Sequence, residues 1–164
     1  EFDPRKAAMY RQLCLIGLRS EAPLASHHSC EDFNRAQPSA LSRVLLGRSY
    51  YNQQAYPQAI TWLNDAIQLN PALGDAYYWL GQSWLSLGQA VTAENYFIEG
   101  LHHEPAYPWS YLELARLKLQ QGCINQAELY LDQMKLIPDE AAIAAANQML
   151  QAVKQSNLVP RNCQ

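Results

Sequence analysis

Two short segments of the sequence hold residue types that bind metals or take part in catalysis. Residues 27–30 read HHSC and residues 101–104 read LHHE. Imidazoles, thiolates and carboxylates are all zinc ligands, but adjacent residues of a helix point about 100° apart and diverge from a single ion. We therefore predict no metal site in either segment, and no cofactor.

The spacings with which enzymes build active sites are missing from the sequence. It has no CxxC or HExxH motif, no phosphate-cradling glycine loop and no GxSxG turn. No pattern ties its histidines, cysteines and carboxylates into a nucleophile and base pair. We expect no catalytic residues, and the chain is not predicted to be an enzyme.

Composition and charge narrow the class of protein further. A chain of 164 residues with 49% hydrophobic content can bury a core. Its longest apolar run, residues 13–18, is far shorter than the roughly 20 residues of a membrane-spanning helix. A formal charge of -3 with only four lysines predicts no basic stripe on the surface. We predict a soluble chain without membrane insertion and without a nucleic-acid partner.

Aromatic residues concentrate in the segment YYWLGQSW, residues 77–84, where they could form a ligand site or a packing face. Residues at i, i+3, i+4 and i+7 share one face of a helix, and here they are Tyr77, Leu80, Gly81 and Trp84. That spacing indicates packing. Tyr78 and Trp79 lie outside this face and are candidates for binding.

The same residue types recur along the chain with a fixed period of 34 residues. The pairs separated by one period are Leu46/Leu80, Gly47/Gly81, Tyr50/Trp84, Ala59/Ala93, Leu63/Phe97 and Pro71/Pro105. A third copy keeps Tyr111, Leu114, Ala115, Ala127 and Leu131 in phase, with its proline one residue early at Pro138. A fixed period of this length indicates an array of stacked units.

This period and residue set resemble the tetratricopeptide repeat (TPR), a helix-turn-helix unit of about 34 residues. The resemblance covers residues 40–139 as three repeats, 40–73, 74–107 and 108–139. It implies an all-α fold, a right-handed α-solenoid of antiparallel helix pairs that winds into a superhelix. Small residues at Gly47, Gly81 and Ala115 would let the paired helices approach closely.

The two ends of the chain fit the same scheme more loosely. Residues 1–39 form an N-terminal helical region, which we interpret as a degenerate repeat; a helix lying across the array is the alternative. Residues 140–156 are rich in helix formers and are predicted to form a capping helix over the last repeat. Residues 157–164 remain as a tail.

The four cysteines do not determine the cellular compartment of the protein. If residues 4–38 align as a degenerate repeat, Cys14 and Cys30 fall on facing helices, where a disulfide would fit in an exported protein. Buried free thiols are the interpretation that we favour from the sequence. The localisation is therefore undetermined, either cytoplasmic or extracytoplasmic, in a periplasm or a lumen.

The resemblance also implies a binding surface, because the first helix of each TPR pair lines an inner concave groove. The candidate groove residues are Val44, Arg48, Tyr51, Asn52, Tyr78, Trp79, Gln82, Leu85, Trp109, Leu112 and Arg116. The tryptophans could equally belong to the core, and the arginines could be ordinary solvated residues. A surface of this kind suits an apolar or aromatic peptide or helix.

Some TPR domains bind the acidic C-terminal tails of chaperones with a clamp of lysine, arginine and asparagine. At the matching positions this chain has Val44, Arg48, Trp79, Trp109 and Glu113, of which one is basic. Chaperone tails are therefore disfavoured. The predicted function is a protein-protein interaction module or scaffold. The alternatives are an accessory domain of a larger enzyme or assembly complex, including one attached to a membrane, and a self-assembling homo-oligomer such as a homodimer.

Overall fold

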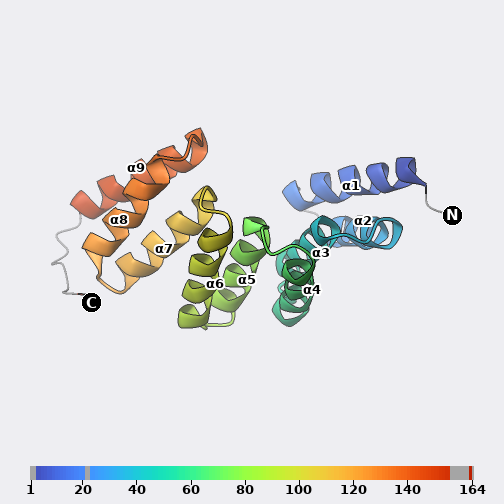
Figure 1. The fold of residues 1–164 in the computed structure, drawn as a ribbon, viewed down its shortest axis with the longest axis horizontal. Helices are drawn as coiled ribbons and strands as arrows, with labels where there is room; N and C mark the ends of the chain where they lie inside the picture. The colour runs from blue at the N-terminus through green and yellow to red at the C-terminus, as the bar shows by residue number, and fades with distance from the viewer. Residues whose placement is uncertain (1–2, 21–22, 156–162, 164) are drawn as a thin grey trace.

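The computed structural model describes residues 3–20, 23–155 and 163, and in this part of the chain all regular secondary structure is helical (Figure 1). The helices are α1 (Pro4–Arg19), α2 (Pro23–Ala36), α3 (Ala40–Asn52), α4 (Tyr56–Leu69), α5 (Gly74–Ser86), α6 (Ala90–His103), α7 (Pro108–Gln120), α8 (Ile124–Lys135) and α9 (Glu140–Gln155). None of these helices is long and apolar enough to cross a membrane.

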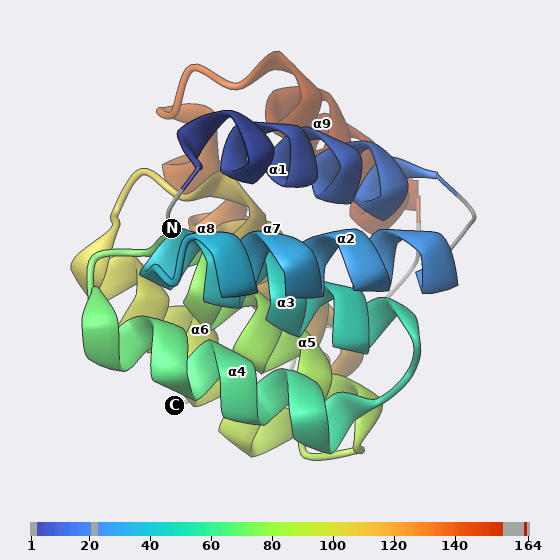
Figure 2. The same ribbon diagram turned by 90° about the vertical axis from the view of Figure 1, so that its right-hand side faces the viewer.

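The helices stack as pairs. The pairs α1 and α2, α3 and α4, α5 and α6, and α7 and α8 pack side by side, and α9 packs on α8 and α7. In both views α4 and α6 lie on the side of the stack away from α1 and α9 (Figures 1 and 2). The predicted all-α solenoid of helix pairs is confirmed. The exact division of the chain into repeats stays a prediction.

Small residues set the distance between the paired helices. A Cβ atom added to Gly47 would lie 2.7 Å from Leu63 Cγ, and one added to Gly81 would lie 2.4 Å from Phe97 Cε1. Real Cβ atoms do not approach other carbons so closely, so α3 can pack on α4, and α5 on α6, only with glycine at these positions.

The core runs the length of the stack and is covered at its C-terminal end. Ala142 and Ala146 of α9 are fully buried in one cluster with Leu131 and Met134 of α8. Without α9 these apolar side chains of the last pair would face solvent. Helix α9 therefore covers the apolar face of the α7–α8 pair.

The structure contains two disulfides, Cys14–Cys30 and Cys123–Cys163, and leaves no described cysteine free. The sequence-based preference for free thiols is therefore wrong. The hairpin of α1 and α2 brings the Cα atoms of Cys14 and Cys30 to 4.8 Å, well within disulfide range. Of the predicted tail, only Cys163 lies among the described residues.

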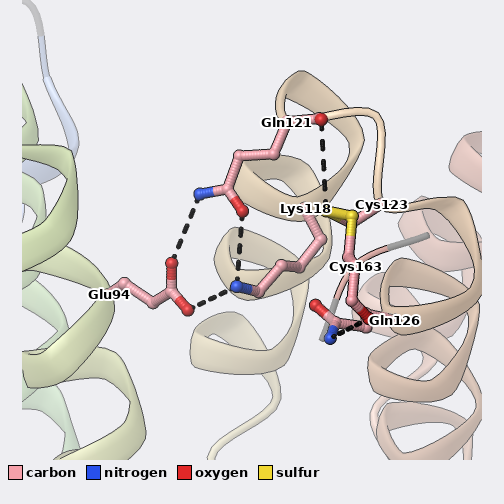
Figure 3. The surroundings of a disulfide bond; sticks show 6 residues. All are labelled: Glu94, Lys118, Gln121, Cys123, Gln126 and Cys163. Carbon is pink, nitrogen blue, oxygen red and sulfur yellow. Dashed lines mark hydrogen bonds and ion pairs between the residues drawn. A yellow bond between two sulfur atoms is a disulfide. The ribbon is translucent and has the colours of Figure 1, made fainter. Parts of the chain in front are cut away.

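Figure 3 shows the second disulfide next to a polar contact between α6 and α7. Lys118 Nζ lies 2.6 Å from Glu94 Oε1, and both side chains are largely buried. Cys123 directly precedes α8, so the disulfide ties Cys163 to the turn between α7 and α8.

The turn between the two helices of a pair contains a residue in the left-handed backbone conformation, with positive φ. Gly88 and Gly122 occupy equivalent positions in two successive pairs and have φ of 76° and 78°, and the equivalent residue of the α3–α4 pair is Gln54, with φ of 61°. A residue with a side chain is disfavoured by roughly 1–2 kcal/mol in this conformation. Gln54 is therefore a locally strained residue in an otherwise regular turn.

We expect Gln54→Gly to raise the free energy of unfolding by about 1 kcal/mol, because glycine relieves this strain. The matched change is Gly88→Gln, which should lower it by about 1–2 kcal/mol, since no atom within 4 Å would obstruct the new side chain and only the backbone is strained. Both are measured by urea unfolding. A shift of the two variants in the same direction would contradict this account.

Candidate functional site

A cluster of aromatic side chains surrounds Trp79, on the first helices of two neighbouring pairs. The ring of Tyr51, from α3, lies 5.1 Å from the Trp79 ring, and the ring of Tyr78 lies 5.2 Å from it, edge-on. Arg48 Cζ sits 4.9 Å from the Trp79 ring centre, within range of a cation-π interaction. We call Arg48, Tyr51, Tyr78, Trp79 and Tyr107 the Trp79 cluster.

Asp75 fixes the orientation of this cluster. Its Oδ1 atom accepts a hydrogen bond from Trp79 Nε1 at 3.1 Å and another from the Tyr107 hydroxyl at 2.8 Å. Tyr107 is the residue before α7, and its ring lies 5.7 Å from Tyr78. One carboxylate thus joins α5 to the start of the next pair and restricts the rotation of two rings.

Two tyrosine hydroxyls of the cluster, those of Tyr78 and Tyr107, have raised pKa values. Burial, with a smaller contribution from Glu113, raises the pKa of Tyr78 to about 12. Burial and the adjacent Asp75 carboxylate raise the pKa of Tyr107 as well. Both hydroxyls therefore remain neutral hydrogen-bond donors at physiological pH.

Not all N–H groups of the Arg48 guanidinium are hydrogen-bonded. Its Nη2 atom donates a long hydrogen bond of 3.5 Å to the Leu18 carbonyl of α1, and its buried Nε atom has no partner. Among the described residues, no carboxylate lies within ion-pair distance of this guanidinium. Arg48 can therefore donate further hydrogen bonds to an arriving group.

Several predicted groove residues lie in the core instead. Val44 is 1% exposed, against Ala76 and Leu80, and Leu112 is 5% exposed in the cluster of the last pair. Their assignment to an open surface was wrong, because each first helix packs on neighbours from two sides. Gln82 is 9% exposed and hydrogen-bonds Tyr78.

The other predicted residues lie at the edges of this region. Leu85 is half-buried against the core of α6 and α7, and Asn52 is half-buried at the end of α3. Trp109 is 38% exposed in the first turn of α7, and Arg116 is exposed and paired with Glu113. The Trp79 cluster thus includes Arg48, Tyr51, Tyr78 and Trp79 from the prediction.

Sequence reasoning missed Tyr107. The residue at the same position of the preceding repeat is Leu73, so the repeat pattern contains no signal for an aromatic residue there. It also missed a cavity of about 230 Å³ among α6, α7 and α8. The cavity is lined by Ile98, Leu101, His102, Tyr111, Leu114, Tyr130 and Gln133.

The residues that first suggested metal chemistry have structural roles. His27 Nδ1 lies 3.0 Å from Ser49 Oγ, and its ring packs edge-on against Tyr50. Cys30 is in a disulfide, and His103 stacks on Tyr77. The described residues hold no group of three or more side chains suited to a metal ion.

The raised pKa of Tyr78 predicts a loss of stability at high pH. An unfolded tyrosine ionises near pKa 10, whereas Tyr78 in the folded chain keeps its proton until about 12. The unfolded chain binds fewer protons in this interval, so the free energy of unfolding falls as pH rises through it, by up to about 1.4 kcal/mol per pH unit.

We expect Tyr78→Phe to reduce this slope, measured by urea unfolding at a series of pH values on either side of 10. Tyr56→Phe is the control for loss of a tyrosine hydroxyl outside the cluster. An unchanged slope in Tyr78→Phe would show that the hydroxyl is not buried as described.

Comparison with known proteins identifies the repeats. A family model described as TPR repeat matches residues 47–88. A search of curated proteins finds no match to the sequence.

Solved structures share the fold at low sequence identity. The pilF protein of Pseudomonas aeruginosa aligns with a TM-score of 0.72 and 19% identity, over 95% of this chain and 72% of that one. MamA aligns with a TM-score of 0.66 and 21% identity, over 91% and 83%. YrrB, a TPR protein with an unusual peptide-binding site, aligns with a TM-score of 0.63 and 18% identity, over 87% and 74%.

The period of the sequence, the stacked helix pairs and the family match agree. The chain therefore contains tetratricopeptide repeats, matched by the family model over residues 47–88, in the helix-pair fold that it shares with solved TPR structures.

Proposed function

We propose that the chain is a protein-interaction module and that its Trp79 cluster binds an apolar or aromatic segment of a partner protein. The observation that carries this proposal is the contact of Trp79 with Tyr51 and Arg48, which joins α3 and α5 into one half-buried aromatic surface. Aromatic side chains and arginine are the residue types that contribute most to binding energy at protein interfaces.

The cluster is ordered before a partner arrives. Asp75 already holds Trp79 and Tyr107, so these rings lose little rotational freedom on binding. A surface whose side chains are fixed in advance binds more tightly, because less entropy is lost. The Arg48 guanidinium, which has no ion-pair partner among the described residues, then supplies polar contacts to a carbonyl or another acceptor of the partner.

Proteins of the same fold support this proposal by analogy. YrrB carries a peptide-binding site, and the first TPR of Spaghetti (RPAP3) was solved with the HSP90 peptide SRMEEVD. Fold analogy alone does not determine the ligand. In this chain Trp79 stands where a clamp for acidic tails would place a polar residue, which favours an apolar or aromatic partner.

The test is a selection of displayed random peptides on the wild-type chain, followed by affinity measurements on the peptides obtained. We expect Trp79→Ala to weaken their binding by about 30-fold, as for an interface residue worth about 2 kcal/mol. Trp109→Ala shows whether the site extends to α7.

Val91→Ala is the matched control, because Val91 is a strongly exposed apolar residue on α6, the second helix of its pair. Helicity and melting of all variants are compared first. Peptides that bind Trp79→Ala and wild type equally would exclude the Trp79 cluster as the site. Sedimentation of the free chain tests for the alternative, self-assembly.

We also propose that the protein resides in an oxidising compartment, such as a periplasm or a lumen. Both disulfides join cysteines of the same chain, and no described cysteine is left free. Disulfides form and persist in such compartments and are rare in a reducing cytoplasm.

We expect the protein isolated from its native source to resist thiol alkylation until it is reduced, and then to react at all four cysteines. The measurement is mass spectrometry after alkylation with and without reductant. Alkylation of Cys14 and Cys30 in the unreduced, denatured native protein would contradict the proposed compartment.

A further inference from the structure

Helix α1 carries an apolar stripe that nothing in the described structure covers. Met9, Leu13 and Ile16 are 49%, 46% and 62% exposed. They lie at i, i+4 and i+7 and therefore share one helix face. The buried residues of α1, among them Ala7 and Cys14, lie on its opposite face, toward α2 and α3.

The same helix concentrates positive charge. Arg5, Lys6, Arg11 and Arg19 are all exposed, and α1 contains no acidic residue, although acidic residues outnumber basic ones by 15 to 12 in the whole chain. Arg5 and Lys6 precede Met9 by four and three residues, and Arg19 follows Ile16 by three. Cations therefore border the apolar stripe at both ends.

Neighbouring carboxylates do not neutralise these cations. Asp3 caps the start of α1 through the backbone N–H groups of Arg5 and Lys6. On α2, Glu31 contacts His27 and His28, and Asp32 pairs with Arg35. Among the described residues, none of the four α1 cations takes part in an ion pair.

The position of α1 determines what this face can contact. The helix lies at one end of the stack and packs on α2 and α3, with its remaining face outward (Figures 1 and 2). A single helix presents a convex ridge. A convex ridge suits a broad, flat surface, whereas a bound peptide needs a groove.

We propose that this face of α1 docks on an anionic lipid bilayer. Arg5, Lys6 and Arg19, which lie nearest the stripe, would approach the negative headgroups, and Met9, Leu13 and Ile16 would enter the boundary between headgroups and acyl chains. A basic helix with an exposed apolar stripe has the charge and shape that such a surface attracts. This contact lies in the plane of the membrane and needs no spanning helix. It is independent of the Trp79 cluster.

The test is co-sedimentation of the chain with vesicles of phosphatidylcholine mixed with phosphatidylglycerol, and with vesicles of phosphatidylcholine alone. We expect binding to the anionic vesicles only, weakened by added salt. Each cation near an anionic membrane contributes about fivefold in affinity, so Arg5→Gln/Lys6→Gln should bind roughly 25-fold more weakly. Leu13→Ser/Ile16→Ser should also lose binding.

Matched controls replace the same residue types elsewhere. Val91→Ser/Leu129→Ser removes exposed apolar side chains of α6 and α8, and Arg35→Gln/Lys135→Gln removes cations of α2 and α8. Both should bind anionic vesicles like wild type, and circular dichroism checks that all variants fold.

Three outcomes would overturn the proposal. One is equal binding to neutral and anionic vesicles. Another is binding that the α1 variants leave unchanged. The third is absence of vesicle binding, together with a dimer in sedimentation that Leu13→Ser/Ile16→Ser dissociates, which would assign the α1 face to a second copy of the chain.

Discussion

The rest of this structure depends on one contact, between a small residue on the first helix of a pair and a larger residue on the second. In two pairs it joins Gly47 to Leu63 and Gly81 to Phe97, at distances that leave no room for a Cβ atom. The contact recurs at the same position of the α3–α4 and α5–α6 pairs, where it lets the two helices of each of these pairs approach closely.

In the first pair a covalent bond is added to this close packing. Cys14 and Cys30 have the same spacing as Gly47 and Leu63, and they occupy the equivalent positions on α1 and α2. Their disulfide is fully buried, and in the same pair Gly17 of α1 packs closely on Ser26 of α2, as Gly47 and Gly81 pack on their partner helices. A disulfide that closes a loop of this length contributes on the order of 3 kcal/mol in the chain-entropy model. It therefore fixes α1 against α2.

The sequence predicted those features that repeat, because they result from packing within one pair. The period, the helix pairs and the positions of Gly47 and Gly81 followed from it. Most contacts between pairs were not predicted. Val44 and Leu112 are buried by neighbouring pairs, and a pattern read from one helix face cannot include those contacts.

Tyr107 was missed for the same reason, because its contact lies between two pairs and not within one. Tyr107 joins Asp75 across the boundary between two pairs, at a position where the repeat itself has Leu73. The positive charge of α1 was not predicted, for another reason. The net charge of -3 averages over the chain and conceals a helix whose charged residues are all basic. Charge has to be counted element by element once the elements are known.

The two ends of the stack also differ in how much apolar surface they leave exposed. At the C-terminal end Ala142 and Ala146 of α9 cover the last pair, and the small side chains of α9 allow a close fit. At the N-terminal end α1 is held by a disulfide and leaves Leu13 and Ile16 exposed. The apolar stripe on α1, bordered by cations, is the surface that we propose for docking on an anionic bilayer, and it does not overlap the Trp79 cluster.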